Sequence, residues 1–588
     1  MLRFLTIILL VVICVSAVQP LAAANDIPVD AVRQGNLDAV KSWLANGGQV
    51  NAVQADGATA LHWAVYAERE GIVDILIDAG ADVTIANRAG VTPLILAAEN
   101  GNAGIMRSLI NTGADPNQRL PNGETVLMMA VRTGDPATVK FLIEQGADVD
   151  ARETLRGTTA LMWAAAYRNN EALALLLDAG ADASAYSNET RPGRRPYLAP
   201  TARDRIDAYK LGIGQAGLSI PVNLEAVPEN DQELNGLSPD VLRIYRNRLE
   251  LQARREAGEI VDEEAEAEAE NQRDPWGGIT ALVFAARENN LEGVQRILAA
   301  GVDVNQTTEF GWSALLTATQ NRYYRLGSYL LNQGADPNIA NKGGWTPLYI
   351  ATDNRNIEGG DYPTRRPDMD HLNYIKLLLK HGADPNMRMA SSTETRTIFT
   401  HQWLYEEGAT PFLRAAQSSD LELMKLLLEH GADPHIATEH GVTPLMVAAG
   451  IGWVEGVTYE WSKEANLATI KLLLELGADV NAQDQVDLRT ALMGAAHKGR
   501  NDIIELLVDH GADLSTHDIG SRDSLHKLAG MRWQALDYAD GLVRVGVQST
   551  IPHPETARLL RKLMLAEGLS VPPEGRTIDS ICVVEICK

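Results

Sequence analysis

The stretch Leu426–His435 reads LLLEHGADPH, and the chain returns to nearly the same ten residues elsewhere. Leu377–Asn386 reads LLLKHGADPN, Leu472–Asn481 reads LLLELGADVN, and Leu506–Ser515 reads LLVDHGADLS. The Leu residues stand at helical spacing, and the Gly is suited to end a helix in the left-handed conformation. The phrase therefore predicts the last turns of a helix and the turn that follows it.

The Gly of this phrase recurs at a nearly constant interval. Successive copies at the start of the chain are 33 or 34 residues apart, and the series resumes after a gap. The positions are Gly47, Gly80, Gly113, Gly146, Gly180, Gly301, Gly334, Gly382, Gly431, Gly477 and Gly511. A constant period in this range indicates a solenoid, in which each unit buries its apolar face against its neighbours.

A second phrase runs in step with the first. It opens with Thr or Ser, often continues with Pro, and contains small Ala residues. Its copies begin at Thr59, Thr92, Thr125, Thr159, Thr280, Ser313, Thr346, Thr410, Thr443 and Thr490. Thr caps a helix N-terminus, Pro suits the first helical turn, and Ala lets a helix lie close to its neighbours. Each unit is therefore predicted to contain two helices.

The T-P-L-H-x-A-A phrase joined to L-L-x-x-G-A-D-V-N at this period resembles the ankyrin repeat. Eleven copies can be aligned; the first, Val29–Asn51, is degenerate and reads as an N-terminal cap. A worn twelfth copy is placed at Ser524–His526, with a helix near Pro554 to Leu565. The resemblance implies an all-α, ankyrin-type helical solenoid with short β-hairpin turns. The shared residues of the two phrases are then structural and mark no binding site.

The N-terminus reads as a targeting segment. Arg3 is followed by the uncharged run IILLVVICVSAV and by the small residues Ala22, Ala23 and Ala24. This order is typical of a secretory signal peptide, and we expect cleavage after Ala24. A retained anchor is the alternative, although the apolar run is short for a bilayer span. We therefore expect an exported protein, periplasmic or extracellular, that is not membrane-bound after cleavage.

The cysteines agree with export. Cys14 lies in the signal segment, whereas Cys582 and Cys587 lie near the last residue in SICVVEICK. In an oxidising compartment this close pair can form a disulfide that pins a terminal turn. Two free thiols in a terminal tail are the alternative.

The largest break in the repeat divides the chain. We expect a signal peptide at 1–24, repeats 1–5 at 25–187, an insertion at 188–275, repeats 6–11 at 276–515, and a cap repeat with a Cys-containing tail at 516–588. The insertion begins rich in Pro, Gly and charge, then continues as a helix with an acidic low-complexity tract. That tract reads as a solvated spacer, with partner docking as the alternative.

Charge narrows the class of partner. Asp and Glu number 77 against 52 Lys and Arg, which gives a formal net charge of -25. Such a surface repels nucleic-acid phosphates and anionic lipids and attracts basic groups. We expect a protein partner with basic or mixed polar segments, and no nucleic acid.

Candidate partner-binding residues come from the positions where copies differ. In ankyrin-like arrays the groove is lined by turn tips and by exposed positions of each first helix. The candidates are Phe310, Trp312, Gln320, Trp345, Asp353, Glu439, His440 and Trp453. Large aromatic residues exposed on a groove are usual anchors of protein interfaces. The alternative is that these aromatics pack on their own insertions.

Motifs of known enzyme classes are missing from the sequence. It contains no H-E-x-x-H, no G-x-S-x-G, no phosphate-binding Gly loop and no calcium loop. His430, His435 and His440 are spaced by five, but His381 and His510 share the repeat position of His430. That position is therefore part of the repeat. We expect no metal, no cofactor and no enzymatic activity.

The function expected from the sequence is recognition of a partner protein through the concave face and the insertions. The chain resembles the exported ankyrin-repeat proteins of bacteria, for which an interaction role is commonly assumed. Two alternatives remain open. One is an enzyme or enzyme-accessory protein whose pocket is formed by the 188–275 insertion or the C-terminal segment. The other is a passive structural spacer.

Overall fold

The computed structural model describes residues 27–188, 277–356, 366–390, 404–454, 458–520, 532–545 and 548–576. The signal peptide, nearly all of the 188–275 insertion and the pair Cys582 and Cys587 lie outside these ranges, so these predictions remain untested. The chain divides into two compact units. We call residues 27–188 with 277–308 the N-terminal array, and the described residues from 309 to 576 the C-terminal array.

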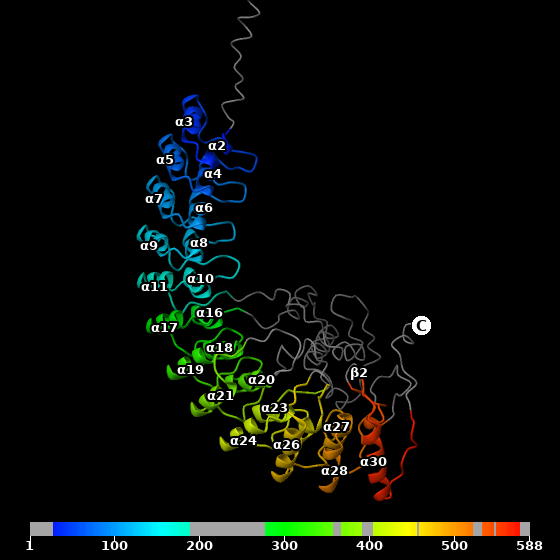
Figure 1. Ribbon diagram of the computed structural model, residues 1–588. Coiled ribbons are helices and arrows are strands. Elements are labelled where there is room, and N and C mark those ends of the chain that lie inside the picture. The colour runs from blue at the N-terminus through cyan, green and yellow to red at the C-terminus, as the bar shows by residue number, and fades with distance from the viewer. Residues whose placement is uncertain are drawn as a thin grey trace, which may run out of the picture. The chain divides into compact units, whose positions relative to one another are not determined.

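The N-terminal array consists of stacked helix pairs, drawn in blue to green in Figure 1. First helices pack on first helices, from α4 through α6, α8 and α10 to α16, and second helices form a parallel row. The pairs are α2 (Val29–Gln34) with α3 (Leu37–Ala45), α4 (Ala60–Tyr66) with α5 (Glu70–Asp78), α6 (Pro93–Asn100) with α7 (Ala103–Asn111), α8 (Val126–Thr133) with α9 (Pro136–Glu144), α10 (Ala160–Ala166) with α11 (Asn170–Asp178), and α16 (Ala281–Arg287) with α17 (Leu291–Ala299).

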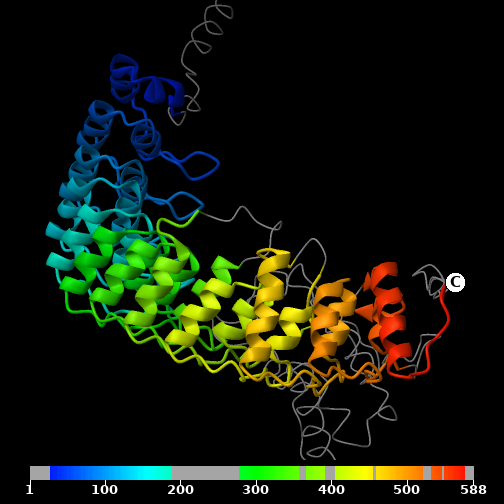
Figure 2. The same cartoon turned by 60° about the horizontal axis from the view of Figure 1, so that its bottom comes forward.

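The C-terminal array repeats this plan, and its yellow-to-red helix pairs stand side by side in Figure 2. The pairs are α18 (Ala314–Gln320) with α19 (Tyr324–Asn332), α20 (Pro347–Arg355) with α21 (His371–Lys380), α23 (Pro411–Gln417) with α24 (Leu421–Glu429), α25 (Pro444–Ala449) with α26 (Lys463–Glu475), α27 (Ala491–His497) with α28 (Asn501–Asp509), and α29 (Ala535–Ala539) with α30 (Pro554–Ala566). The all-α solenoid expected from the resemblance is confirmed.

The residues of the two phrases have the structural roles that the sequence suggests. Thr410 caps α23, its hydroxyl accepting the amide N–H of Leu413 at 3.2 Å, and an equivalent Thr, or Ser313 for α18, caps each of the other first helices from α4 to α27. Gly431 follows α24 with a φ of 87°, the left-handed conformation that favours Gly. His430 lies against the end of its own helix, with Nδ1 2.9 Å from the Leu426 carbonyl oxygen. The repeated His is therefore structural.

The final Asn of the first phrase links neighbouring repeats. The Asn386 side chain donates to the Gly431 carbonyl at 2.9 Å and accepts the Asp433 amide at 2.7 Å. The same pair of bonds is made by Asn51, Asn117, Asn338 and Asn481. These amides satisfy backbone groups at the turns and so hold the register between repeats.

The helix pairs on either side of the predicted insertion stack directly on each other. α10 packs on α16 and α11 on α17, although residues 189–276 lie between these two pairs in the sequence. The backbone N–H of Ser187 donates to the Ile279 carbonyl at 2.9 Å, and Tyr186 pairs with Thr280 in an antiparallel bridge. The described residues on either side of this stretch, 186–188 and 278–280, therefore lie together at one turn tip, and the fifth and sixth repeats remain in contact.

The last repeat differs in part from the prediction. Its first helix, α29, begins after Gln534, which takes the place of the capping Thr, and reads ALDYA. The phrase proposed at Ser524–His526 lies outside the described residues. The second helix, α30, is close to its expected position. Between them, strands β1 (Arg544–Val545) and β2 (Gln548–Ser549) pair antiparallel; elsewhere in the described ranges, turn tips show only isolated bridges.

Candidate protein-recognition surface

One position on the first helices distinguishes the two arrays. It lies four residues after the capping Thr or Ser and is the variable position of the T-P-L-H-x-A phrase. In the N-terminal array it forms what we call the N-terminal row, which consists of Trp63, Leu96, Met129, Trp163 and Phe284. Met129 is buried, and the other four side chains are half-buried. Because successive first helices pack side by side, these side chains follow one another from repeat to repeat.

The two Trp residues of the row have fixed orientations. The indole N–H of Trp63 donates to Gln54 Oε1 at 2.7 Å, and that of Trp163 donates to Thr158 Oγ1 at 2.8 Å. These bonds fix the orientation of both indole rings. Rings held in this way lose little conformational entropy when a partner packs on them.

Tyr residues extend the same surface beyond the row. Tyr66 and Tyr167 are 58% and 55% exposed, so most of each phenol ring faces solvent. Tyr66 stands edge-on to Trp63, with ring centroids 6.0 Å apart, and Tyr167 lies 6.1 Å from Trp163 at a tilted angle. The spacings of three and four residues place each pair on one face of its helix. Repeats 2 and 5 therefore present similar aromatic pairs.

Charged side chains of both signs border the row. The guanidinium carbon of Arg33 lies 5.6 Å from the centroid of Trp63, and that of Arg287 lies 4.9 Å from Phe284. Arg132 and Glu99 form an ion pair of 2.8 Å between neighbouring repeats. The border is thus mixed in charge, in contrast to the acidic balance of the whole chain.

In the C-terminal array the equivalent position is buried. There it is occupied by Thr317, Ile350, Arg414, Val447, Gly494 and Tyr538, and every one of these residues is buried. Arg414 is 1% exposed. Burial of a guanidinium requires charge compensation and hydrogen bonds, because removing it from water costs several kcal/mol, on the order of 5.

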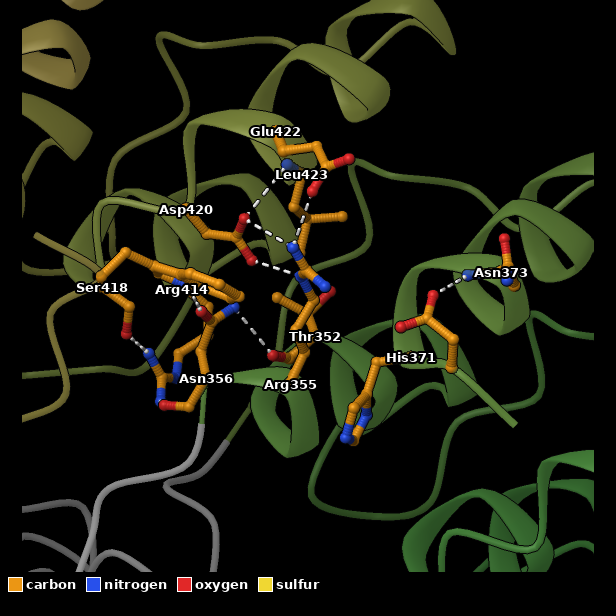
Figure 3. Close-up of polar contacts among 12 residues, drawn as sticks. Thr352, Arg355, Asn356, His371, Asn373, Arg414, Ser418, Asp420, Glu422 and Leu423 are labelled. Carbon is orange, nitrogen blue, oxygen red and sulfur yellow. Dashed lines mark hydrogen bonds and ion pairs between the residues drawn. The ribbon is translucent and has the colours of Figure 1, made fainter. Parts of the chain in front are cut away.

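Arg414 obtains this compensation from α20 and from its own helix, as Figure 3 shows for its bonds to Asn356 and Ser418. Its Nε donates to Asp353 Oδ1 at 2.7 Å, Nη1 to Ser418 Oγ at 2.8 Å, and Nη2 to the Asn356 carbonyl at 2.6 Å. All three nitrogens of the guanidinium are therefore bonded. Charge-assisted bonds of this length are the strong class of protein hydrogen bonds.

A second buried ion pair lies beside the first. Arg355, at the end of α20, donates from Nε to Asp420 Oδ2 at 2.7 Å and from Nη2 to Glu422 Oε2 at 3.1 Å, and Figure 3 shows it between these two carboxylates. Asp420 also caps α24 by accepting the Leu423 amide at 3.2 Å. The face of Trp461 covers Arg355, with the guanidinium carbon 4.7 Å from the ring centroid.

Trp461 also joins two repeats that are not neighbours in sequence. Its indole N–H donates to Asn356 Oδ1 at 2.9 Å, and its backbone N–H donates to the Ser418 carbonyl at 3.2 Å. It precedes α26 of the tenth repeat, whereas Asn356 follows α20 of the eighth. In a simple solenoid each repeat contacts only its neighbours. We call Arg414, Asp353, Arg355, Asp420 and Asn356 the buried clasp; Trp461, itself 43% exposed, covers it.

Histidine and tyrosine extend the polar interior. The Tyr324 hydroxyl lies 2.8 Å from His371 Nδ1, and its ring stacks on Tyr374 at 4.3 Å. Burial, with the nearby charges of Arg322 and Arg355, lowers the pKa of His371 to about 4. His371 is therefore neutral at pH 7.

A further polar group lies where α27 meets α25 and α26. Lys498 donates to Glu460 Oε1 at 2.9 Å and lies over the Trp453 ring, 5.5 Å from its centroid. Burial lowers the pKa of Lys498. Burial also lowers the pKa of His497 to about 4. Like the buried clasp, this group packs ionisable side chains inside the array.

The structure corrects part of the predicted binding set. Trp345 and Asp353 are each only 6% exposed, so the expectation that they are exposed on the surface is wrong. Trp345 packs edge-on against Trp312, with centroids 6.0 Å apart, and Asp353 holds Arg414. Both side chains stabilise the array from inside, and neither presents a face to a partner.

The other predicted residues lie nearer the surface. Glu439 is exposed, and Phe310, Trp312 and Gln320 are half-buried. His440 is half-buried, with Nε2 3.8 Å from Glu407 Oε2. Trp453, also half-buried, packs edge-on against His497 at 5.8 Å. A role of these residues in partner binding remains a prediction.

Sequence reasoning missed the N-terminal row. Trp63 and Trp163 stand inside the repeated phrase, of which only the shared residues are predicted to be structural. The signal that could have identified them is variability, because the position four residues after the cap holds Trp, Leu, Met, Phe, Thr, Ile, Arg, Val and Gly. A position that the repeat leaves free to vary is one that its packing does not determine.

Two tests for other kinds of site concern only the described ranges. Within them, no group of three His, Cys, Asp or Glu side chains is arranged to hold a metal ion. None of the helices described there combines the length and apolar character required to cross a bilayer. The proposed enzymatic pocket of the 188–275 insertion falls almost entirely outside these ranges.

Comparison with known families accounts for the stacked pairs. Residues 29–120, 94–187, 282–389 and 460–547 match the family model described as "Ankyrin repeats (3 copies)". Residues 407–439 match the family model described as "Ankyrin repeat". Together these matches cover more than half of the chain.

Curated relatives share only part of their length with this chain. "Ankyrin repeat and SOCS box protein 6" of Pongo abelii is 34% identical over 122 residues, which is 20% of this chain and 29% of that protein. "Ankyrin repeat and SAM domain-containing protein 6" of Rattus norvegicus is 39% identical over 75 residues, 13% and 7% of the two chains. "Mitochondrial disaggregase" of Homo sapiens is 44% identical over 50 residues, 8% and 7%. The chain spans less than a third of each relative.

Proposed function

Because this chain belongs to the ankyrin-repeat family, whose repeats imply a protein-interaction scaffold, we propose that it binds a partner protein through the N-terminal row and its flanking Tyr residues. One observation carries the proposal. In the N-terminal array the variable first-helix position is partly exposed in four of five repeats and holds Trp63, Trp163 and Phe284, whereas in the C-terminal array it is buried in every repeat. The N-terminal array is thus the one with this position open to a partner.

The chemistry of the row suits protein recognition. Trp and Tyr supply large apolar contact areas and are enriched among the residues that dominate binding energy. Tyr66 and Tyr167 also offer hydroxyl groups at the edge of the contact. Two aromatic pairs on separate repeats give a partner two anchor points on one surface.

We infer the charge of the partner from the net charge of the whole chain and from the charged side chains close to the row. The net charge of -25 would attract a basic partner over distances comparable to the Debye length. Close to the row, Arg33, Arg287 and the Arg132–Glu99 pair favour a segment of mixed charge. We therefore propose a partner with mixed polar segments, with any basic groups placed away from the row.

Export is part of the same proposal. It is supported by the signal-like order of residues 1–24 and by the cysteines near the last residue. The binding event would then take place in a periplasm or outside the cell. Intact-mass analysis of the protein recovered from its native compartment should give a chain that begins after Ala24; a retained Met1 would contradict export by cleavage.

The experiment compares three forms of the full chain as bait in affinity capture. The forms are the natural sequence, the double variant W63L/W163L, which keeps apolar bulk but removes the indole rings, and the control Y459L. Tyr459 is an exposed aromatic of the C-terminal array. A captured protein should then be purified and its binding measured directly by calorimetry.

The expected result is a partner that binds the natural chain and Y459L alike and binds W63L/W163L at least about tenfold more weakly. Hydrogen exchange in the complex should show protection on α4 and α10. Equal binding of W63L/W163L, with protection elsewhere, would move recognition away from the row and contradict the proposal.

A further inference from the structure

The last helix pair of the C-terminal array, α29 and α30, is followed by a segment that turns back onto it. We call this segment, residues 569–576, the clip. We propose that the clip locks α29 and α30 onto the stack, and that these two helices detach together when the clip opens, while the preceding repeats stay folded. This conformational device is independent of partner binding by the N-terminal row.

The last repeat gains less from apolar packing than the repeat before it. α28 buries Ile503 and Ile504 against its neighbours. At the same positions, counted from the first helical residue, α30 buries Thr556 and Ala557. Buried apolar area is the main stabilising contribution to such an interface. The smaller side chains of α30 therefore hold it less firmly on the stack than α28 is held.

α30 also has an open side. Leu565, three residues before Gly568, is 66% exposed, whereas the equivalent residue of α28, Val508, is half-buried. No helix follows α30 among the described residues. An internal repeat of a solenoid is stabilised by neighbours on both sides, and a terminal one by a single neighbour. The last repeat therefore depends more on contacts of its own.

Arg561, in the middle of α30, supplies the first of these contacts. Its Nε donates to the Pro572 carbonyl at 3.3 Å, and its Nη2 donates to the Pro573 carbonyl at 3.1 Å. The same Nη2 lies 2.8 Å from Oδ2 of Asp540, the residue that directly follows α29. Arg561 thus joins α29, α30 and the clip at one point.

Arg576 fastens the end of the clip to the same carboxylate. Its Nη2 lies 2.8 Å from Asp540 Oδ2, and its Nη1 lies 2.6 Å from Asp537 Oδ1. The side chains of Asp537 and Asp540 are only 6% and 9% exposed, and buried carboxylates require such compensation. Arg576 is 26% exposed, against 10% for Arg561, so we expect the clip to open first at Arg576.

The backbone of the clip suits a segment that is held by few contacts. Gly568 and Gly575, on either side of its middle, have φ values of 75° and 76°, which lie in the left-handed region. Pro572 and Pro573 between them restrict the backbone in the free chain as well as in the folded one. Ordering the clip therefore costs less conformational entropy than ordering a flexible segment of the same length.

Hydrogen exchange of the full chain at pH 7 tests the proposal with Arg576→Gln. The matched control is Arg558→Gln, because Arg558 lies on the same helix and pairs with Glu555 in an exposed position, with side chains 59% and 74% exposed. Asp540→Asn interrupts the same contact from the opposite side. It is measured alone and in combination with Arg576→Gln.

The expected result is exchange at least about tenfold faster throughout α29 and α30 in Arg576→Gln, with α23 and α25 unchanged. Arg558→Gln should exchange like the natural chain. Asp540→Asn should also speed exchange in α29 and α30. The double variant should show less than the product of the two single effects, because the shared contact can be lost only once.

Three outcomes would overturn the proposal. Unchanged exchange of α29 and α30 in Arg576→Gln would show that the clip does not hold them. An equal effect of Arg558→Gln would mean that any loss of charge near α30 loosens it. A rise of the same size in α23 and α25 would show that the last repeat does not open as a separate unit.

Discussion

The same helix position is used in opposite ways in the two arrays. In the N-terminal array it holds side chains such as Trp63 and Trp163, which are partly exposed and donate to the neutral side chains of Gln54 and Thr158. In the C-terminal array it holds Arg414, which is 1% exposed and forms bonds through all three of its nitrogens. The same arrangement of helices thus presents a partly exposed apolar row in one array and surrounds buried polar side chains in the other.

The difference reflects how each array is stabilised. Within the described ranges of the N-terminal array, the buried polar residues are mainly Thr, with His62 and Glu153 as the ionisable examples. The described part of the C-terminal array buries several Arg and Asp side chains, together with Lys498, that depend on one another. A buried charge network is costly to interrupt, and it holds specific geometry. The comparison predicts that substitutions at equivalent positions have unequal effects.

The largest effect is expected for Arg414→Met, which gives the C-terminal array the side chain that Met129 supplies in the N-terminal array. Asp353 would remain buried after losing the ion pair with Arg414, and the free energy of unfolding should fall by about 3–5 kcal/mol. Urea denaturation followed by circular dichroism measures the change. The matched substitution Met129→Leu should cost less than about 1.5 kcal/mol.

A double variant shows whether the cost comes from the uncompensated charge. Arg414→Met combined with Asp353→Leu removes both members of the pair, and most of the lost stability should return. If the double variant is as unstable as the single one, the hydrogen bonds to Asn356 and Ser418 account for the effect. If Arg414→Met costs less than about 1 kcal/mol, the charge network is not what stabilises this array.

The next effect is acid sensitivity of the C-terminal array. His371 and His497 have folded pKa values lowered to about 4, below the value of about 6.5 in an unfolded chain. Their neutral forms therefore contribute stability in full above pH 6.5, and this contribution is lost as pH falls towards 4. Each should account for about 2–3 kcal/mol across that window.

Hydrogen exchange at pH 7 and pH 4.5 locates this loss. Protection should fall in α21 and α27 at the lower pH, and His371→Gln should remove the pH dependence of α21 only. In the N-terminal array burial also lowers the pKa of His62. The pH dependence of protection in α4 should therefore be the same in the natural chain and in His371→Gln, which makes α4 an internal reference. A loss of protection that is equal in His371→Gln and in the natural chain would contradict the assignment to His371.

The sequence predicts the fold because the residues that begin and end each helix act within their own repeat. Thr410 and Gly431 act within their own repeat, through a cap and a left-handed turn, so their roles can be interpreted without the rest of the chain. Burial of Trp345 and Asp353 could not be predicted in this way. It depends on side chains from other repeats: Asp353 is held by Arg414 of the ninth repeat, 61 residues away.

The clasp illustrates the same limit at longer range. Trp461 is bonded to Asn356, 105 residues away, across an intervening repeat. Neither residue belongs to the repeated phrases, and no local pattern connects them. The N-terminal row was missed for the opposite reason, because Trp63 and Trp163 lie inside a phrase whose other residues are structural.

Trp461→Leu should have an intermediate effect. It removes the indole bond to Asn356 and the ring face over Arg355, and should lower the free energy of unfolding by about 1–2 kcal/mol. Because the contact skips a repeat, hydrogen exchange should increase at the end of α20, two repeats before the substitution. The control Trp163→Leu, in the N-terminal array, should increase exchange only in its own and adjacent repeats. Increased exchange confined to α26 in Trp461→Leu would show that repeats 8 and 10 are not coupled.

The smallest effect on stability is expected at the surface of the N-terminal array. Tyr66 and Tyr167 are more than half exposed, so Tyr66→Ala and Tyr167→Ala should each change the free energy of unfolding by less than about 0.5 kcal/mol. The same substitutions should weaken partner binding several-fold, because exposed aromatic rings contribute contact area only in the complex. This separation of stability from binding is what distinguishes an open row from a closed interior. A destabilisation of about 2 kcal/mol or more would mean that these rings support the fold, and the contrast between the two arrays would then lose its functional meaning.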